Sequence, residues 1–543
     1  MQWNRKRLSM PDLSNNSRDT RDLYDLFIIG GGVNGCGVAR DASGRGLSVA
    51  LAEMNDIASA TSSSSTKLFH GGLRYLEYFD FRLVREALIE REVLLKAMPH
   101  ISWPMRFVLP HNHTMRFETS TPLACLLSRL FPWMKGRRPA WLMRFGLFLY
   151  DHIGGRKILP ATKLIDLTTD ESGKPLKDVF VDAFEYSDCW VEDSRLVVLN
   201  ARDAEQRGAL IMPYTKVISA KRRDGCWQVV TEDAETGDRS VFFAKCLVNA
   251  GGPWVEEIIK NKIRQSSMDG LRLVRGSHII THKLYEHEKS YIFQGEDGRV
   301  IFTIPYENDF TLIGTTDVDH PDLAKRPVCS NEETEYLLAF ASSYFRKPVL
   351  RSDIIASFSG VRPLYDDGAN DATAATRDYV LRLDDEEGIP LLNIFGGKIT
   401  TYRRLSESVM KKLAPFFAKM SGSWTAGVTL PGGDFCVNGF EPLVYKIRTK
   451  FPFLPGRVAR RLARAYGTDT WSILAQIHSV DDLGDDFGAG VYAAELDWAI
   501  EHEWVSSAED FVWRRTRLGL RLSKNQIATI DDYVKRNRIN LAK

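Results

Sequence analysis

The stretch Asp25–Glu53 constrains the fold of this chain more than any other. A short apolar run over residues 26–29 is followed at once by Gly30-x-Gly32-x-x-Gly35 and a segment rich in small residues. This order is typical of a buried parallel strand that turns through glycines into a helix. The glycines allow the backbone to approach a pyrophosphate closely, and the helix N-terminus presents unpaired N–H groups to its negative charge. The stretch therefore predicts a dinucleotide-binding βαβ unit.

The residues that follow narrow the choice of cofactor. A second apolar run, Leu47–Ala52, ends at Glu53, where a carboxylate can accept hydrogen bonds from a ribose. An acid at this position favours an unphosphorylated ribose, so FAD or NAD is expected rather than NADP. The next segment, Thr61–Leu76, is a hydroxyl-rich run with a lysine and a glycine pair. Alone it is typical of a solvated loop, but directly after a dinucleotide unit it predicts a lining for a phosphate and a flavin ring.

Length and composition limit the possible number of domains, partners and cellular compartments. The 543 residues are 44% hydrophobic and 26% charged, which suffices for two or three domains with large cores, and the net charge of +2 does not indicate a nucleic-acid partner. Seven cysteines show no C-x-x-C pair and no metal-like spacing, so we expect reduced thiols in a cytosolic setting and no metal. No run of about 18 apolar residues occurs, so no transmembrane helix is expected. Residues 1–21 lack the apolar core of a secretory signal, which favours a disordered tail.

Several motifs resemble one family. Gly30–Gly37, Thr61–Leu76 and Pro104–His111 (PMRFVLPH) are similar to the bacterial aerobic FAD-dependent glycerol-3-phosphate dehydrogenases, a branch of the D-amino-acid-oxidase-like flavoproteins. Further matches are YSDCW, VNAGGPW, RGSHI, IGTTDVD, SGVRPL and FGGKITTYR, so the resemblance extends from about Leu26 to the C-terminus. It implies FAD as the cofactor, sn-glycerol 3-phosphate as the substrate and a membrane quinone as the electron acceptor.

The expected fold class is α/β (α+β), with a Rossmann-like FAD-binding domain, an antiparallel-sheet substrate domain and a C-terminal helical domain. The runs between Gly270 and about Tyr379 alternate in polarity and predict an antiparallel sheet, whereas the chain after Met420 is helical in pattern. The expected divisions are a disordered tail over 1–22, FAD-binding parts over 23–100, 180–260 and 390–420, substrate parts over 101–179 and 261–389, and the helical domain over 421–543.

The resemblance places the cofactor contacts on the glycine turn, the end of the second strand, the hydroxyl-rich loop and three later segments. A helix that starts at Thr400 is expected to aim its positive end at the flavin pyrimidine. The residues expected to bind FAD are Gly30, Gly31, Gly32, Asn34, Gly35, Glu53, Thr61, Ser62, Ser63, Lys67, Val217, Gly251, Gly397, Lys398 and Thr400.

Oxidation of a secondary alcohol by a flavin needs a hydride acceptor, a base for the hydroxyl proton and, for a phosphorylated substrate, cations. Arginine suits the last role because its planar fork binds phosphate oxygens in pairs. The resemblance assigns Arg74 in HGGLRYL and Arg362 in SGVRPL to the substrate and its phosphate, with Arg377 in TRDY as a further candidate. The alternative for any one arginine is a structural ion pair.

His278 in RGSHI is the preferred general base because imidazole titrates near working pH, and His70 is the second candidate. The alternative for either histidine is a structural residue, or for His70 a hydrogen bond to the flavin. Lys398 is expected to contact the flavin or the oxygen on the oxidised carbon, or else to face water at a helix start. Tyr75 is expected to form a wall of the pocket.

The segment Leu123–Tyr150 mixes Leu, Phe and Trp with five basic residues and contains no acidic residue. Such a mixture fits a segment that lies in a membrane interface, with its cations on anionic head groups. A helical hairpin packed on the protein, with an exposed basic face, is the alternative. The resemblance to peripheral membrane enzymes favours the interface.

We therefore expect an FAD-dependent sn-glycerol-3-phosphate dehydrogenase that forms dihydroxyacetone phosphate and reduces membrane quinone, peripheral on the cytoplasmic face of the inner membrane. Its expected partners are the substrate, quinone and an anionic membrane surface, with a homodimer as the assembly considered. One alternative is an oxidase of the same fold that reduces oxygen, or another D-amino-acid-oxidase-like flavoenzyme. A flavin-bearing regulatory or scaffold protein is an alternative from another class.

Overall fold

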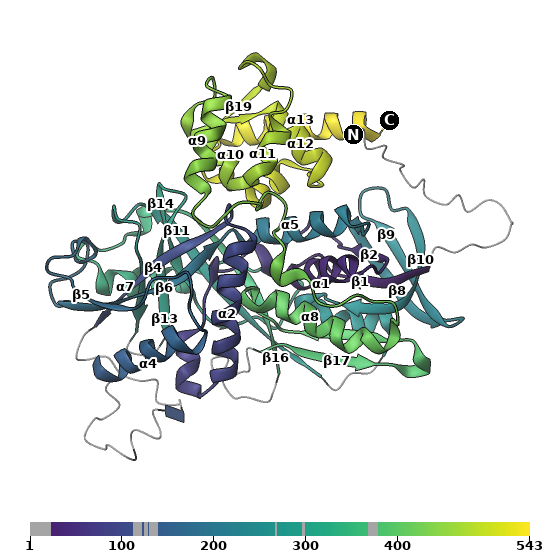
Figure 1. Cartoon of the computed structure of the whole chain (residues 1–543), viewed down its shortest axis with the longest axis horizontal. Coiled ribbons are helices and arrows are strands. Elements are labelled where there is room, and N and C mark those ends of the chain that lie inside the picture. The colour runs from purple at the N-terminus through teal and green to yellow at the C-terminus, as the bar shows by residue number, and fades with distance from the viewer. Residues whose placement is uncertain are drawn as a thin grey trace.

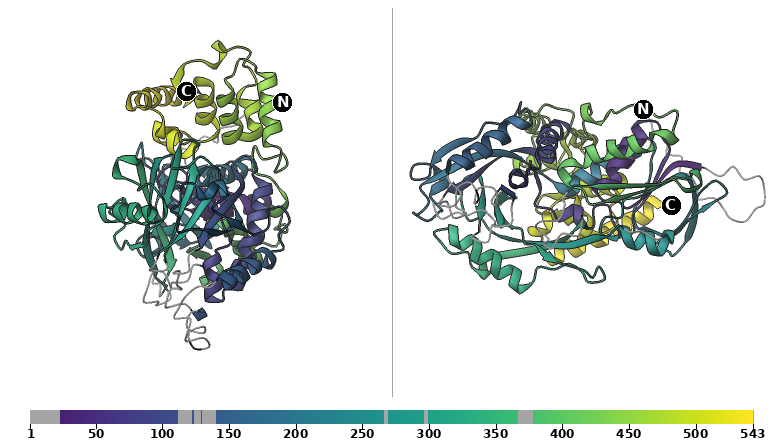
Figure 2. Two further views of the ribbon diagram at one scale, coloured as in Figure 1. Left: turned by 90° about the vertical axis from the view of Figure 1, so that its left-hand side faces the viewer. Right: turned by 90° about the horizontal axis from the view of Figure 1, so that it is seen from below.

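The structure is a computed structural model that describes residues 23–111, 122–123, 129, 140–265, 269–295, 299–366 and 378–542. These residues form two large β-sheets that lie side by side and a mainly helical unit that packs across them and contains a two-stranded sheet (Figure 1). Figure 2 shows the helical unit as a separate layer above the sheets. The predicted tail over 1–22, Arg377 and most of the residues between Leu123 and Ala140 lie outside the described part of the chain.

The eight-stranded sheet contains the predicted dinucleotide unit. Its strands β18, β10, β1, β2 and β7 are parallel, while β17 and the hairpin β8–β9 extend it with antiparallel pairs. The predicted order of strand, glycine turn, helix and strand is confirmed. The strands are β1 (Leu23–Ile29), β2 (Val49–Ala52), β7 (Leu210–Met212), β8 (Thr215–Arg223), β9 (Cys226–Asp233), β10 (Arg239–Asn249), β17 (Val380–Asp384) and β18 (Leu391–Phe395).

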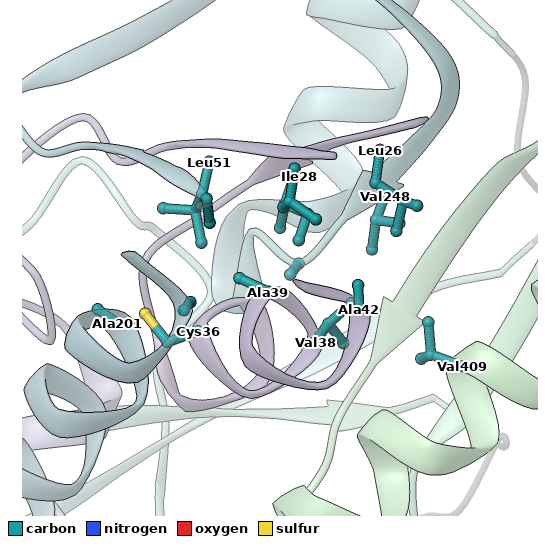
Figure 3. Packing of buried hydrophobic residues seen from close by; sticks show 14 of the residues in the cluster. Leu26, Ile28, Cys36, Val38, Ala39, Ala42, Leu51, Ala201, Val248 and Val409 are labelled. Carbon is teal, nitrogen blue, oxygen red and sulfur yellow. The ribbon is translucent and has the colours of Figure 1, made fainter. Parts of the chain in front are cut away.

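Three helices cover one face of this sheet. Figure 3 shows the strand residues Leu26, Ile28 and Leu51 pointing at the helix that follows the glycine turn, with the other two helices on either side. Small residues such as Ala39 and Ala42 let that helix lie close to the strands, because only short side chains separate the two backbones. The helices are α1 (Val33–Gly44), α5 (Asp193–Gln206) and α8 (Tyr402–Leu413).

The hairpin β8–β9 covers the other face. Val217, Trp227 and Val229 pack there against Phe27 and Ile29 of β1, whose side chains alternate with those that face α1. Strand β1 is thus buried on both faces, as its uninterrupted apolar run predicts.

The second sheet has ten strands in the order β15-β11-β14-β13-β12-β4-β6-β3, with β16 paired to β11 and β5 paired to β6. All of its pairs are antiparallel except β12 with β4, which confirms the predicted antiparallel sheet. The strands are β3 (Leu68–Phe69), β4 (Ser102–His111), β5 (Lys163–Asp166), β6 (Asp182–Val191), β11 (Leu271–His282), β12 (Ser290–Gln294), β13 (Val300–Tyr306), β14 (Phe310–Gly314), β15 (Val318–Asp319) and β16 (Ile354–Tyr365).

Helices cover both faces of this sheet as well. On one face lies α7 (Asn331–Tyr344), which begins with a capping box in which Ser330 and Glu333 satisfy each other's backbone N–H groups. On the other face lie α2 (Phe81–Ala97) and α4 (Ala140–Ile153), which pack Leu88 and Leu147 into one apolar cluster with the strands. The helix predicted over Phe81–Met98 is therefore present.

The C-terminal unit is helical, as predicted. It has two apolar clusters of its own, and Trp498 is buried in one of them. No helix in the described ranges is both long enough and apolar enough to cross a bilayer. The elements of the unit are α9 (Phe440–Lys450), α10 (Gly456–Tyr466), α11 (Thr470–Ile473), β19 (Asp486–Gly488), β20 (Val491–Tyr492), α12 (Ala493–His502) and α13 (Lys524–Ala542).

Two segments differ from the sequence-based expectation. Residues 182–191, placed by sequence in an FAD-binding part, form β6 and pair with β4 of the ten-stranded sheet along its whole length. A strand that is buried on both faces has no polarity pattern to reveal its partner. The helix expected to start at Thr400 begins instead at Tyr402, after a 3-10 turn over Ile399–Thr401.

Candidate active site

The turn after β1 contains two glycines, Gly30 and Gly35, at positions where a side chain would clash with the backbone. Gly30 has φ of +109°, and a Cβ atom there would lie 2.6 Å from the carbonyl oxygen of Ala250, at the end of β10. A Cβ on Gly35 would lie 1.9 Å from the carbonyl oxygen of Gly30. The turn, the start of α1 and the end of β10 therefore meet backbone to backbone.

Polar side chains border this turn from two directions. Glu53 accepts a hydrogen bond from the Gly31 N–H at 2.7 Å, which places its carboxylate beside the glycines. Ser62 Oγ accepts one from the N–H of Val33, the first residue of α1, at 3.0 Å. The Asn34 side chain donates to the Gly396 carbonyl at 3.1 Å, and its buried Oδ1 has no partner within the described structure. The turn thus keeps one buried polar atom, Asn34 Oδ1, that no described group satisfies.

A cavity of about 370 Å³ lies against the glycine turn. It extends from Glu53 past the turn to Val217 on one side and Gly251 on the other. Most of the predicted cofactor residues line this cavity: Gly30, Gly31, Gly32, Asn34, Glu53, Thr61, Ser62, Val217, Gly251 and Gly397.

A second cavity, of about 830 Å³, continues from the first. Thr61, Pro363, Gly396 and Gly397 line both cavities, so the two form one elongated site between the sheets. The larger cavity brings together the other predicted residues: His70, Arg74, Tyr75, Arg362, Lys398 and Thr400. A narrow end beside a glycine turn and a wide end with convergent cations fit the adenosine and flavin ends of FAD with room for a substrate.

Arg362, on β16, is held in place by three consecutive residues that follow β14. Its guanidinium donates to the Asp317 carboxylate at 2.5 Å, to the Thr315 hydroxyl at 2.9 Å and to the Thr316 carbonyl at 3.3 Å. A Cβ on Gly276 would lie 2.3 Å from its Nη2, so that glycine makes the space for the guanidinium. An arginine fixed in this way presents a preorganised fork to an anion in the cavity.

Lys398 and Tyr75 meet across the larger cavity. The Lys398 ammonium lies 3.7 Å from the centroid of the Tyr75 ring, a cation–π contact between residues far apart in the sequence. Lys398 and Tyr75 both line the cavity. Arg74, which belongs to the same 3-10 helix as Tyr75 (Leu73–Tyr78), lines it as well. Positive side chains therefore gather at the end of the site beyond Gly397.

His278 does not itself line the cavity. It is 1% exposed on β11, stacks on Phe358 with ring centroids 4.8 Å apart, and its Nε2 lies 3.0 Å from the Thr66 hydroxyl. Burial, reinforced by the positive charges of Arg362 and Lys67, lowers the pKa of His278 to about 3, so the ring is neutral at physiological pH. Thr66 lines the cavity and connects it to the histidine.

Lys67 also lies behind the cavity wall. It is 1% exposed and adopts φ of +62°, and its ammonium donates to the Asp193 carboxylate at 2.8 Å and to the Ser63 carbonyl at 3.2 Å. Ser63 and Gly35 line neither cavity. Ser63 supports the hydroxyl-rich loop, and Gly35 supports the glycine turn.

Three residues of the site were absent from the sequence prediction. Thr66 stands in the hydroxyl-rich run among similar residues, so nothing in the run singles it out. Asp193 lies in the motif YSDCWVEDSR, which was recognised, but its role depends on a contact with distant Lys67. Asp317 follows IGTT, and only the folded structure shows that it pairs with Arg362.

Comparisons with known proteins show the family of this chain. The sequence model of the family described as FAD dependent oxidoreductase matches residues 25–403, and that described as C-terminal domain of alpha-glycerophosphate oxidase matches residues 423–535. A D-erythritol 1-phosphate dehydrogenase of Brucella abortus is 47% identical over 94% of this chain and 98% of its own. The aerobic glycerol-3-phosphate dehydrogenase of Escherichia coli is 43% identical over 94% of this chain and 97% of its own.

Among solved structures, the glycerol-3-phosphate dehydrogenase from Bacillus halodurans complexed with FAD superimposes with a TM-score of 0.72 at 26% identity. The match covers 96% of this chain and 91% of the other. The family model and the FAD-bound neighbour agree on FAD as the cofactor. The chain belongs to the FAD-dependent oxidoreductase family and is a flavoenzyme with an added C-terminal helical domain.

Proposed function

We propose that this flavoenzyme oxidises the secondary hydroxyl of a small polyol phosphate, with sn-glycerol 3-phosphate oxidised at C2 to dihydroxyacetone phosphate. The observation that carries the proposal is the wide end of the site, where Arg74, Arg362 and Lys398 face one cavity that continues into the FAD cavity. A phosphate needs cations, and the carbon to be oxidised must lie next to the flavin, so both requirements meet in this cavity.

The relatives support the substrate class. One relative is named as a glycerol-3-phosphate dehydrogenase and another, at similar identity, as a D-erythritol 1-phosphate dehydrogenase. Both compounds are short polyols that carry a single phosphate. We therefore propose sn-glycerol 3-phosphate as the substrate, with a four-carbon polyol phosphate as the second candidate.

We assign the following roles in the reaction to the cofactor and the site residues. Bound FAD supplies the two-electron acceptor for hydride transfer from the alcohol carbon. Arg362 and Arg74 hold the phosphate and so orient the polyol along the cavity. His278 receives the hydroxyl proton, with the Thr66 hydroxyl between its Nε2 and the cavity. Burial lowers the pKa of His278, so the ring is neutral and can accept a proton, but it is a weaker base than the ordinary imidazole expected from the sequence.

The proposed acceptor is a quinone in the membrane, reached from α4. The exposed side chains of α4 include Trp141, Phe145 and Phe148, which are 60%, 53% and 53% exposed, whereas Leu147 and Tyr150 on its other face are buried. Phe145 also lines the larger cavity, so one apolar surface runs from outside the protein into the site. This arrangement supports a peripheral position on a membrane, with aromatic side chains in the interface. The proposed membrane is the inner membrane, on its cytoplasmic face.

An oxidase that reduces oxygen is the competing proposal, because the C-terminal family model takes its name from an alpha-glycerophosphate oxidase. The two are separated by the acceptor: rapid oxygen consumption with sn-glycerol 3-phosphate in the absence of quinone supports the oxidase, and turnover that requires quinone supports the dehydrogenase.

Substitution of Arg362 tests the phosphate site. In Arg362→Met we expect the KM for sn-glycerol 3-phosphate to rise on the order of 100-fold, because a charged hydrogen bond to the substrate is lost, while FAD remains bound. Initial rates with a soluble dye as acceptor and the flavin absorbance measure the two quantities. Arg382→Met is the matched control, since Arg382 pairs with Asp269 and lines neither cavity. An unchanged KM, or loss of FAD with KM intact, contradicts the assignment.

Substitution of His278 tests the base. In His278→Asn the rate of flavin reduction at saturating substrate is expected to fall by about 100-fold or more, because the hydroxyl proton loses its acceptor. His287→Gln serves as the control, since burial also lowers the pKa of His287 and this residue lines neither cavity. Stopped-flow absorbance gives both rates, and a His278→Asn variant that reduces its flavin at the wild-type rate excludes His278 as the base.

The exposed face of α4 tests the membrane proposal. Replacing Trp141 and Phe148, which line neither cavity, by serine is expected to release the protein from anionic vesicles in a sedimentation assay, while activity with a soluble dye persists. The control replaces Leu164 and Val179, exposed apolar residues outside α4, by serine. The proposal is wrong if the α4 variant sediments with vesicles as the control does.

A further inference from the structure

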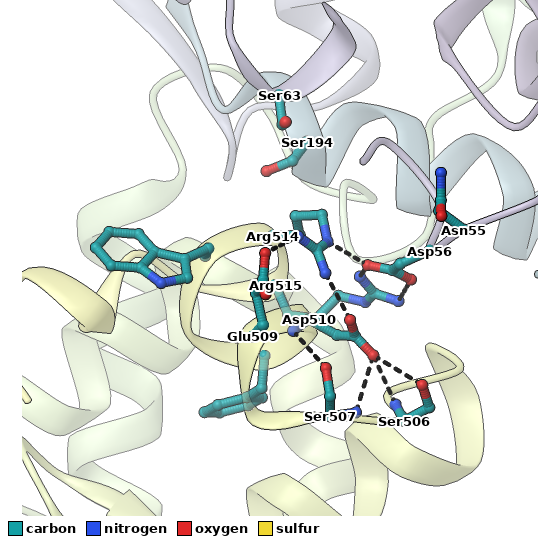
Figure 4. Close-up of polar contacts among 12 residues, drawn as sticks. Asn55, Asp56, Ser63, Ser194, Ser506, Ser507, Glu509, Asp510, Arg514 and Arg515 are labelled. Atoms are coloured by element: carbon teal, nitrogen blue, oxygen red, sulfur yellow. Dashed lines mark hydrogen bonds and ion pairs between the residues drawn. The ribbon is translucent and has the colours of Figure 1, made fainter. Parts of the chain in front are cut away.

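The C-terminal unit reaches the FAD-binding part through arginines that lie close together in the sequence. Arg514 and Arg515 both point toward Asp56, as Figure 4 shows. Arg514 Nε lies 2.5 Å from the Asp56 carboxylate, and the two Nη atoms of Arg515 lie 2.7 and 2.8 Å from it. Asp56 and Arg515 are buried, so this is an ion pair out of contact with water.

Asp56 lies on the loop that borders the adenosine end of the site. The loop begins after Glu53, and its Ala58 N–H donates to the carbonyl oxygen of Gly31 in the glycine turn at 3.1 Å. Residues Met54, Asn55 and Ala58 of the same loop line the smaller cavity. The arginines therefore hold a segment that contacts the cofactor cavity directly.

Arg517 makes the equivalent contact at the flavin end. Its Nη2 donates to the Asp193 carboxylate at 2.6 Å and to the Ser194 hydroxyl at 2.9 Å. The same carboxylate receives the Lys67 ammonium at 2.8 Å, the Ser65 hydroxyl at 2.8 Å and the Ser65 N–H at 3.1 Å. Asp193 thus joins Arg517 to the loop Thr61–Lys67, in which Thr61 and Ser62 line the smaller cavity and Thr61 and Ser64–Thr66 line the larger one.

The ionised state of the Asp193 carboxylate depends on both of its cationic partners, Lys67 and Arg517. The side chain is fully buried, and although burial alone raises the pKa of Asp193, the charges of Lys67 and Arg517 outweigh it and keep the pKa below its ordinary value. Removing one partner from a buried ion pair is strongly destabilising because the other charge stays in a medium that solvates it poorly. Without Arg517, the Asp193 carboxylate and the loop it holds would have to rearrange.

We propose that the C-terminal unit is a working part of the cofactor site: Arg517 positions the flavin-side loop through Asp193, and Arg514 with Arg515 positions the adenosine-side loop through Asp56. FAD retention and docking of the C-terminal unit are then energetically coupled. Coupling is reciprocal, so the unit strengthens FAD binding and bound FAD strengthens the docking of the unit. The inference rests on FAD binding and is independent of the substrate proposed above.

The first test compares FAD release from the full-length holoenzyme in three variants. In Arg517→Met the rate of FAD release on dilution, followed by the fluorescence of free flavin, is expected to rise by about tenfold or more, with Arg517→Lys intermediate. Arg521→Met is the matched control, because Arg521 also joins the C-terminal unit to the core but pairs with Glu307 and Asp309, away from both cavities. Its release rate is expected to stay within about twofold of the wild type.

The second test needs no substitution and decides the matter if the Arg517→Met protein does not fold. Limited proteolysis of the wild-type holoenzyme is followed with and without a large excess of free FAD. Mass action keeps the site filled, so cleavage within residues 423–535 is expected to slow when FAD is added. The proposal is overturned if added FAD leaves cleavage of this region unchanged, or if Arg517→Met folds and releases FAD no faster than Arg521→Met.

Discussion

The contact between the glycine turn and the end of β10 is the constraint on which the rest of the structure depends. Gly30 turns the chain against the carbonyl of Ala250 with no room for a Cβ atom on either side of the turn. This contact places the start of α1 beside a cavity that Gly31, Gly32, Val33 and Asn34 line. The parallel strands, the three covering helices and the cofactor cavity all take their positions from it.

The second sheet completes the site by placing charge where the cofactor cavity widens. Arg362 lies on β16, which also carries Pro363 at the junction of the two cavities. The pairing of β16 with β11 brings Arg362 opposite Val274 and places Gly276 beneath its guanidinium. Buried carboxylates then hold the loops between the sheets, and Asp193 and Asp56 do so with arginines from the C-terminal unit. The chemistry of one cavity is therefore supported by all three parts of the chain.

The sequence predicted the features that depend on local pattern. The βαβ unit was predictable because a buried strand, a glycine turn and a helix of small residues follow one another within one short stretch, and α2 was predictable from its helical spacing. Contacts between distant residues had no such signal. Arg517 and Asp193 are 324 positions apart, and nothing near either residue indicates the other. The sequence also did not predict the sheet to which β6 belongs, because a strand buried on both faces fits either sheet.

The same contrast between local motifs and contacts of distant residues holds for the candidate site. Motif resemblance placed Arg74, Tyr75, Arg362 and Lys398 around one cavity, as the structure has them. It did not indicate that Thr66 stands between that cavity and His278, because the orientation of a side chain depends on the neighbours that fold around it. Residue types and motifs thus led to the chemistry of the site, whereas the path of the proton depends on tertiary packing.

The central claim is that this flavoenzyme oxidises a phosphorylated polyol. The most direct test is to mix the FAD-loaded protein with sn-glycerol 3-phosphate in the absence of oxygen and to follow the flavin absorbance, with D-erythritol 1-phosphate and unphosphorylated glycerol as comparisons. We expect rapid loss of the oxidised flavin band with a phosphorylated polyol and none with glycerol. A flavin that stays oxidised with both phosphates, or that glycerol reduces equally well, would contradict the account.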